Sequence, residues 1–358
     1  MSHHEVRLEQ DLQRIKERVH QVGREVQAAV QNAVHSLLSC DQELAAQTIL
    51  GDLHINRETR EIDRLCHAFV ARHYPSAGPL RFVSSVLRLD VGLERIGDYA
   101  VTIAREAVQL KSPPPKGIAR DIEMMADHSR RMLQQGLQSF HEGNPEMARG
   151  AIGLANQIGR TFTKVFNDLI QEGEQGNLRI QDLFALLVSF NRLERISDQA
   201  KNICEETVFA ATGQTKEPKV YRILFLDREN NGRSKMAEAF ARKAFPESGK
   251  YRSAGWQPAG EVPDALQQFL DAKGCTPDSL SPVPWTPLHD ELADQHVVVG
   301  LESGAREQIP DLPFHTVFLD WSNPPLTEFS ESEMAEAFAQ LANQVRELME
   351  TMHGEDAG

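Results

Sequence analysis

The sequence is poor in cysteine, in basic residues relative to acidic ones, and in long apolar runs. Its 358 residues include only 4 cysteines, none in a CxxC pair, which argues against disulfides and zinc fingers. Lys and Arg number 38 against 52 Asp and Glu, for a net charge of −14, so we do not expect nucleic acid as a partner. No apolar run approaches the roughly 20 residues of a membrane span. We therefore predict a cytoplasmic protein.

Proline and tryptophan are scarce in the first three fifths of the chain. Residues 1–217 hold only six of the 18 prolines, three of them consecutive at 113–115, and all three tryptophans follow residue 218. A stretch with so little proline can form long helices, because proline breaks the helical hydrogen-bond ladder. The proline-rich remainder needs shorter elements. We place the boundary between the two parts at residues 211–219.

The first part has helical periodicity almost throughout. Its clearest apolar stripe advances by three or four residues at each step and comprises Leu89, Leu93, Ile96, Ala100 and Ile103. Similar stripes cover residues 5–39, 42–73, 118–142, 145–173 and 178–210. The pattern predicts six helices, three on each side of the proline run.

The two halves of this helical part resemble each other. LERIGDYAVTIAREAV at 93–108 matches LERISDQAKNICEETV at 193–208, an offset of 100 residues. A weaker match, with an offset of 103, joins 41–49 to 144–152. A near-constant offset indicates a duplicated module. We predict an all-α pair of three-helix bundles, with one repeat in residues 1–112 and the other in 117–212.

After residue 218 the pattern changes to short apolar runs that alternate with helices. Candidate strands lie at 220–226, 251–256, 296–301 and 315–319, and candidate helices at 235–245, 262–273 and 333–352. Such alternation is typical of a parallel sheet covered by helices. Residues 218–358 are therefore predicted to form a doubly wound α/β domain with four parallel strands.

Carboxylates recur at helical spacing in both repeats. Asp90, Glu94 and Asp98 follow one another at i, i+4 and i+8, and Glu194 and Asp198 repeat the last two positions. Neighbouring like charges repel, and a hard cation would turn that repulsion into ligation. On spacing alone, a solvated charged face is the favoured interpretation. The recurrence of ExxxD strengthens the metal interpretation without deciding between the two.

The same segments, with GDLHINRETREID at 51–63, resemble the signature helices of the PhoU family of phosphate-signalling proteins. The resemblance covers about residues 5–212 and implies multinuclear metal sites. The matching positions are Asp52, Asn56, Glu94, Asp98, Glu194 and Asp198. The second repeat offers only Asn156 where the family tends to place acids, and Gly92 and Pro79 stand where the family pattern tends to have Asp.

The resemblance also implies a cofactor and partners. The donor set predicts iron, manganese or magnesium rather than zinc, with the first repeat preferred over the second. The implied partners are a phosphate transporter and a sensor histidine kinase at the cytoplasmic face of the inner membrane, so we also consider a peripheral membrane location. We further predict a homodimer.

In the second part, ILFLDRENNGRSKMAEAF at 223–240 places a polar loop between a strand and a helix. Such a loop offers N–H groups to an anion, Arg233 can contact two oxygens, and Ser234 can cap the helix. The alternative is an ordinary turn with Arg233 in a surface salt bridge. The segment resembles the phosphate-binding loop of low-molecular-weight protein tyrosine phosphatases and arsenate reductases, whose pattern is C-x5-R-S. The predicted anion-binding loop comprises Asp227, Asn230, Gly232, Arg233 and Ser234, of which Asn230, Arg233 and Ser234 fit the family pattern.

Two residues depart from that family's chemistry. Asp227 stands at the nucleophilic cysteine, and Asn323 stands at the acid before a proline on a late loop. A catalytic thiolate attacks the oxyanion centre, and an amide cannot protonate a leaving group. We expect an inactive domain. The alternative is that Asp227 itself acts as a carboxylate nucleophile.

Three functions follow from these interpretations. The favoured one is a cytoplasmic regulator of phosphate uptake and phosphate signalling, in which a PhoU-like module carries a pseudo-phosphatase domain. The second is an arsenate reductase or tyrosine phosphatase tethered to a PhoU-like module. A DNA-binding repressor is disfavoured by the charge balance and by the lack of a helix with clustered Arg and Lys.

Overall fold

The computed structural model describes residues 3–353, except for 156–157, 177, 217–218, 276–279, 287–290, 293, 310–311 and 314–315. The chain forms two compact units, residues 1–216 and 217–358, and the division falls within the segment 211–219. In the part of the chain that the structure describes, no helix has the length and apolarity required to cross a lipid bilayer.

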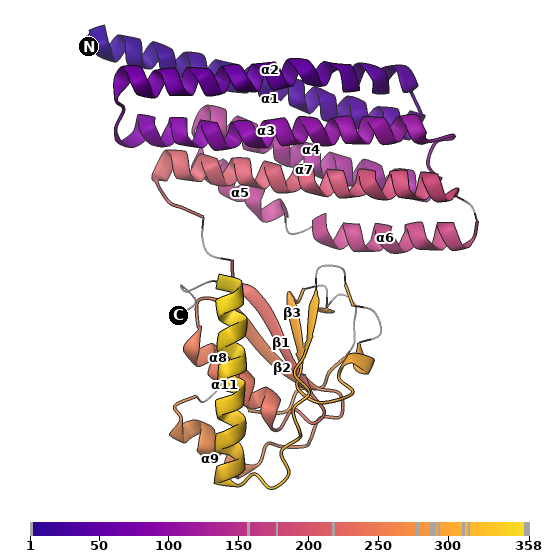
Figure 1. The fold of residues 1–358 in the computed structure, drawn as a ribbon, viewed down its shortest axis with the longest axis vertical. Coiled ribbons are helices and arrows are strands. Elements are labelled where there is room, and N and C mark those ends of the chain that lie inside the picture. Colours follow the sequence, from indigo (N-terminus) through magenta and orange to yellow (C-terminus); the bar gives the residue numbers. More distant parts are fainter. Residues whose placement is uncertain are drawn as a thin grey trace. The chain divides into compact units, whose positions relative to one another are not determined.

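The first unit is entirely helical (Figure 1). Its helices are α1 (His3–Ser39), α2 (Gln42–His73), α3 (Ala77–Gln109), α4 (Lys116–Glu142), α5 (Pro145–Ala155), α6 (Ile158–Glu174) and α7 (Ile180–Thr212). The predicted helix at 145–173 is wrong, because two helices occupy this segment. Gly153 and Gly159 both lie in it, and glycine weakens a helix interior. The other predicted helices are confirmed.

Local chemistry fixes several helix ends. Asp41 caps α2, with its side chain accepting a hydrogen bond from the Leu44 N–H at 3.0 Å. Gly143 ends α4 with φ 64°, a left-handed conformation that glycine adopts readily. Pro115 stands at the N-cap of α4, where the missing N–H of a proline costs no helical hydrogen bond.

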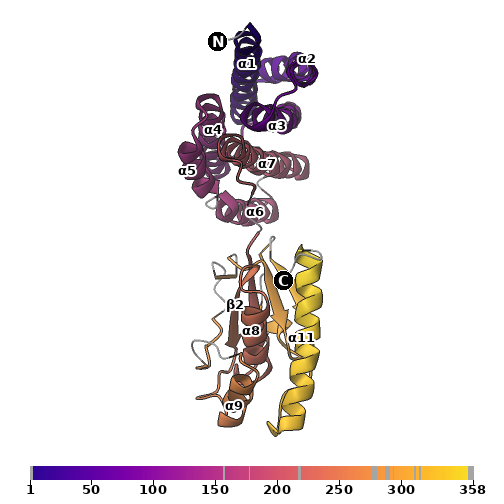
Figure 2. The same ribbon diagram turned by 90° about the vertical axis from the view of Figure 1, so that its left-hand side faces the viewer.

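Helices α3 and α7 form the centre of the unit. Helix α3 packs on α1, α2 and α7, and α7 also packs on α4, α5 and α6. Figure 2 shows this unit nearly end-on, with α1 to α3 grouped together and α4 to α6 around α7. The predicted stripe from Leu89 to Ile103 is fully buried, and one continuous apolar core includes residues of both repeats. The prediction of a paired helical bundle is confirmed.

The second unit contains a four-stranded parallel sheet with strand order β2-β1-β3-β4. The strands are β1 (Tyr221–Asp227), β2 (Gly249–Gly255), β3 (Val297–Gly300) and β4 (Val317–Asp320). The helices are α8 (Arg233–Ala244), α9 (Asp264–Ala272) and α11 (Glu331–His353), with a 3-10 turn at Arg306–Gln308. The predicted α/β domain with a parallel sheet is confirmed.

Alternate residues of β1 face two separate cores. Ile223 and Phe225 pack with apolar residues of α8, α9 and α11, which cover one face of the sheet (Figure 1). Leu224 and Leu226 pack on the other face with residues such as Leu292. This double burial explains the continuous apolar run of β1. The strand ends at Asp227, at the carboxyl edge of the sheet, where open α/β folds bind ligands.

Candidate functional site

The predicted acidic residues of the first repeat lie along the packed pair α2 and α3. Asp52 and Asn56 are one turn apart on α2, and the Asn56 side-chain amide donates to Asp52 Oδ2 at 2.8 Å. On α3, a Cβ built at Gly97 would lie 3.7 Å from Asp52 Oδ1. The bare glycine backbone therefore lets the Asp52 carboxylate approach α3 beside Asp98.

Asp90 and Asp98 on α3 are both held above their ordinary pKa. Burial raises the pKa of Asp90 to about 8, and the carboxylates of Asp63 and Glu94 contribute to the rise. Burial is also the largest cause of the raised pKa of Asp98, and repulsion from the carboxylates of Asp52 and Glu94 adds to the rise. The carboxylates of α2 and α3 thus repel one another across the helix pair, and a cation would relieve that repulsion.

Asp63 belongs to this acidic face and was not predicted from the sequence. It lies on α2, 11 residues after Asp52, and 11 helical steps of 100° return to within 20° of the starting direction. The 11-residue spacing within GDLHINRETREID could therefore have placed it on the same face. Its carboxylate also lies 3.4 Å from His67 Nδ1.

Three buried oxygens on this face lack a hydrogen-bond donor. They are Asp52 Oδ1, Asn56 Oδ1 and Asp90 Oδ1. A buried acceptor without a partner is costly, and hard cations are bound by such carboxylate and amide oxygens. Within the described residues, however, no three His, Cys, Asp or Glu side chains gather closely enough to hold one ion. The oxygen donors fit a metal in chemical type, but they are distributed along the helices.

The second repeat presents a different arrangement. Asp198 is about half exposed, and its carboxylate accepts from the Arg195 guanidinium at 3.2 Å, one turn away. Glu194 lies one turn before Asp198 on α7 and is partly buried. Asn156, which the sequence offered as a third donor, lies outside the described residues. A cationic side chain therefore already occupies part of the second ExxxD motif.

The loop between β1 and α8 closes around the Asp227 carboxylate. Asp227 is only 2% exposed; its Oδ1 accepts from the Asn230 N–H at 2.6 Å and its Oδ2 from the Ser234 N–H at 2.9 Å. Burial raises the pKa of Asp227, and the hydrogen bonds from Ser234 and Asn230 act in the opposite direction. An acid at the base of the loop thus uses the N–H groups that an anion would use.

Asn230 and two glycines determine the path of this loop. Asn230 has φ 52°, donates to Ser234 Oγ at 2.8 Å and accepts from the Val283 N–H at 2.7 Å. Gly232 is the N-cap residue of α8. A Cβ at Gly255 would lie 2.8 Å from both Arg228 O and Asn230 N, so only glycine lets the end of β2 approach the loop backbone this closely.

Arg233 makes its hydrogen bond away from Asp227. Its Nε donates to Pro324 O at 2.6 Å, and its Nη1 is buried without a partner. Burial lowers the pKa of Arg233, with Glu302, Glu333 and Glu336 acting against that change. The guanidinium is therefore neither in an exposed surface salt bridge nor aimed at the loop carboxylate.

Lys235 and Glu302 complete the surroundings of Asp227, and neither was predicted. Burial raises the pKa of Glu302, and the carboxylates of Asp227 and Glu229 add to the rise. Burial lowers the pKa of Lys235, and the negative charges of Glu238 and Asp227 act in the opposite direction. Glu302 follows β3, which lies beside β1, so the rule that carboxyl ends of parallel strands meet at one edge could have placed it.

Asn323, at the predicted proton-donor position, is held by α11. Its Oδ1 accepts from Gln340 Nε2 at 2.6 Å, its Nδ2 donates to Gln344 Oε1 at 3.4 Å, and the residue is 4% exposed. Both polar atoms of the amide therefore have partners within the unit. Neither hydrogen bond reaches the loop that contains Asp227.

These features define the class of the protein. A duplicated helical bundle with an ExxxD motif in each central helix is joined in one chain to an α/β unit with a phosphatase-like loop. The PhoU domain model matches residues 19–107 and 118–207, and the low molecular weight phosphotyrosine protein phosphatase model matches residues 222–356. The chain belongs to the PhoU family and carries a low-molecular-weight phosphatase domain after the two PhoU repeats.

Two relatives agree with the PhoU part of this assignment, and a third similar structure is an arsenate reductase. A phosphate-specific transport system accessory protein PhoU homolog from Pseudomonas putida is 29% identical over 205 residues, which are 57% of this chain and 80% of the relative. The crystal structure of PhoU from Pseudomonas aeruginosa is similar with a TM-score of 0.55 and 27% identity, covering 57% of this chain and 99% of that one. A thioredoxin-dependent arsenate reductase from Corynebacterium glutamicum is similar with a TM-score of 0.33 and 24% identity, over 42% of this chain and 75% of its own.

Proposed function

We propose that the chain is a cytoplasmic regulator of phosphate uptake and phosphate signalling, and that its phosphatase-like unit has no catalytic activity. The phosphate-transport role is supported by the PhoU repeats and by relatives named as accessory proteins of phosphate-specific transport. A phosphate transporter, a sensor histidine kinase and a second copy of the chain are the proposed partners, and contact with the transporter would bring the protein to the inner membrane.

The observation that carries the inactive assignment is the buried Asp227 carboxylate. It accepts two loop N–H groups that would otherwise stabilise an anion during phosphoryl transfer. A carboxylate nucleophile would need exposure to the substrate, whereas Asp227 is 2% exposed. Asn323 supplies no proton, because its amide is engaged by Gln340 and Gln344. Nucleophile and acid are both absent from the positions where the family chemistry needs them.

We predict that the purified chain turns over neither para-nitrophenyl phosphate nor arsenate. Initial rates measured with and without a thiol reductant should equal those of an Arg233→Ala variant, which removes the loop guanidinium. Asp227→Cys alone should restore little, because no acid stands at residue 323. Turnover by the unmodified chain that disappears with Arg233→Ala would establish the alternative function, a phosphatase or arsenate reductase tethered to PhoU repeats.

We further propose that the first repeat binds hard cations, namely iron, manganese or magnesium. Asp52 and Asn56 would contribute unpaired oxygens beside Asp98 at one place on this face, and Asp90 would contribute its own beside Asp63 and Glu94 at another. A bound cation would supply positive charge that offsets the mutual repulsion of these carboxylates. We expect the second repeat to bind a cation more weakly than the first, because Asp198 already pairs with Arg195.

Metal content should depend on Asp98 more than on Asp198. Asp98→Ala is expected to remove most of the bound metal, whereas Asp198→Ala, at the equivalent position of the second repeat, should leave the content nearly unchanged. Elemental analysis after reconstitution with iron, manganese or magnesium measures this directly. Equal losses of metal in the two variants would contradict the preference for the first repeat. If the protein stays metal-free after every reconstitution, these acids form a solvated charged face and not a metal site.

A further inference from the structure

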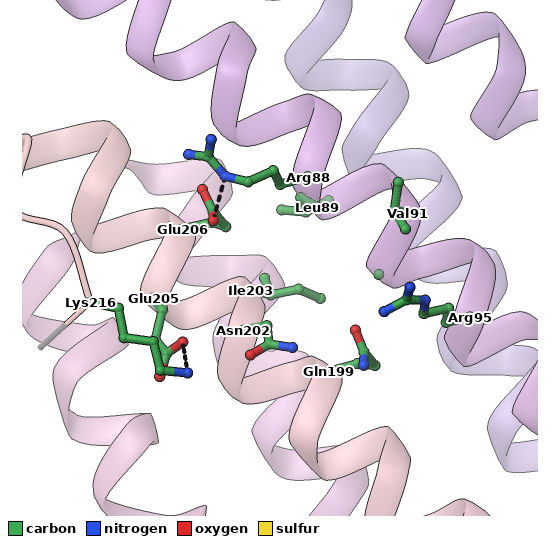
Figure 3. Close-up of a pocket in the computed structure, with 11 residues that line it drawn as sticks. Arg88, Leu89, Val91, Arg95, Gln199, Asn202, Ile203, Glu205, Glu206 and Lys216 are labelled. Carbon is green, nitrogen blue, oxygen red and sulfur yellow. Dashed lines mark hydrogen bonds and ion pairs between the residues drawn. The ribbon is translucent and has the colours of Figure 1, made fainter. Parts of the chain in front are cut away.

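A pocket opens between the two central helices of the PhoU unit. It has a volume of about 300 Å³ and is lined by residues of α3 and α7 together with Lys216 (Figure 3). Leu89, Val91 and Ile203 supply apolar surface, while Arg95, Gln199 and Asn202 lie around the opening between the helices. The volume is at the lower end of the range for small-molecule sites.

The pocket exists because the two repeats differ at a pair of equivalent positions. With the 100-residue offset, Gly92 corresponds to Arg192 and Gln199 corresponds to Tyr99. The Arg192 guanidinium carbon lies 5.4 Å from the centre of the Tyr99 ring, so that pair brings two large side chains into contact. At the equivalent place, Gly92 has no side chain, and a Cβ there would meet only Gln199 Oε1 at 3.5 Å. The internal symmetry is broken where the pocket lies.

Each of the two carboxylates of the pocket is paired with one cation, and the second oxygen of Glu206, Oε2, is buried without a hydrogen-bond donor. Arg88 Nε donates to Glu206 Oε1 at 2.6 Å, and Lys216 Nζ lies 2.8 Å from Glu205 Oε2. The Arg88 guanidinium also stacks over the Phe209 ring, with its carbon 4.9 Å from the ring centre. Figure 3 shows the two ion pairs on one side of the pocket. Two of the three cations of the pocket are thus paired with its two carboxylates.

Arg95 is that third cation. In the second repeat, the Arg195 guanidinium pairs with the Asp198 carboxylate at 3.2 Å. Within the described residues, Arg95 has no such bond to Asp98, which lies near the carboxylates of Asp52 and Glu94 instead. The pocket therefore carries three cationic and two anionic side chains, a net positive charge in a chain of net −14. A guanidinium beside two side-chain amides is a donor set suited to oxyanions.

We propose that this pocket binds a small anion of the phosphate class, either inorganic phosphate or the phosphate group of a small ester. Arg95 contacts two of its oxygens, and the side-chain amide N–H groups of Asn202 and of Gln199 donate to the others, the Gln199 amide turning by 180° from the orientation in which its Oε1 faces Gly92. The absence of a side chain at Gly92 provides the room. This site is separate from both the ExxxD metal face and the Asp227 loop, and its ligand is bound, not transformed.

Calorimetric titration of the full-length chain with inorganic phosphate, and in parallel with AMP and sulfate, tests the assignment. We expect saturable binding of phosphate or AMP at millimolar concentration or tighter, with sulfate weaker. Whether phosphate or AMP binds more tightly identifies the free ion or the ester as the ligand. Arg95→Ala should weaken binding by about tenfold or more, because it removes the charge-assisted hydrogen bonds. Gly92→Leu, which fills the pocket and favours the helix, should do the same.

Two matched variants localise the effect. Arg195→Ala, at the equivalent position in the second repeat, and Arg233→Ala, in the phosphatase-like loop, should each leave affinity within about twofold of the unmodified chain. Circular dichroism confirms that each variant is folded. Absence of binding up to about 10 mM of all three anions overturns the assignment, as does binding that survives both Arg95→Ala and Gly92→Leu. Turnover in the phosphatase assay is a separate readout and leaves this test unaffected.

Discussion

Replacing Asp227 by Ser is expected to increase the affinity of the phosphatase-like loop for phosphate or arsenate by about 100-fold or more. The change removes a buried negative charge from the loop and frees the N–H groups of Asn230 and Ser234. At about 4 Å and an effective dielectric near 20, one such charge opposes an anion by about 4 kcal/mol, and the expected gain is smaller because the freed groups must be desolvated. Calorimetric titration in an Arg95→Ala background isolates the loop from the α3–α7 pocket.

Glu229→Ser is the matched control for this prediction. Glu229 lies in the same loop but is exposed, and its carboxylate accepts from the Asn231 side chain rather than from the loop N–H groups that hold Asp227. Removing it should change anion affinity by less than about fivefold. Equal gains from the two substitutions would show that total loop charge, and not occupation by Asp227, controls the site.

Replacing Asp90 by Asn is expected to raise the free energy of unfolding of the metal-free protein by about 2–4 kcal/mol at pH 8. The pKa of Asp90 is raised to about 8, so the folded state binds this proton more tightly than the unfolded state, where the pKa of an aspartate is the ordinary 3.8. The stability of the unmodified protein should therefore fall as pH rises from about 4 to 8. Asparagine keeps the shape of the side chain and removes the ionisation.

Urea unfolding at a series of pH values measures this effect. The advantage of Asp90→Asn should shrink as pH falls and vanish below about pH 3.8, where the aspartate is protonated in both states. Asp198→Asn, a change at an exposed and ion-paired acid, should alter stability by less than about 0.5 kcal/mol throughout. Added Mn²⁺ or Mg²⁺ should stabilise the unmodified protein more than the Asp90→Asn variant. An advantage that does not vary with pH would contradict the role given to Asp90.

Periodic features of the sequence were sufficient to predict the fold. The stripe from Leu89 to Ile103 repeats with the period of a helix and is buried, and the continuous apolar run of β1 reflects burial on both faces of a sheet. The division of residues 145–173 into α5 and α6 was missed, since the apolar periodicity continues through both helices. Helix ends depend on a few residues of low propensity and are weakly encoded.

Site residues were predicted where one local motif brings them together. Asp227, Asn230 and Ser234 lie within eight residues, and their hydrogen bonds follow from the loop itself. Contacts between distant segments were not accessible in the same way. Pro324 diverts Arg233 from the loop carboxylate, and Glu302 approaches Asp227 from the neighbouring strand. The α3–α7 pocket likewise depends on which faces of two helices meet, although its origin at Gly92 is visible once the repeats are aligned.

A crystal structure of the full-length chain grown in phosphate tests most directly the claim that Asp227 occupies its own anion loop. We expect no anion within the loop, with the Asp227 carboxylate accepting from the N–H groups of Asn230 and Ser234, and Arg233 donating to the Pro324 carbonyl. A phosphate bound by those N–H groups, with Arg233 turned from Pro324 to contact it, would contradict this claim. It would show that the loop of the phosphatase-like unit binds oxyanions.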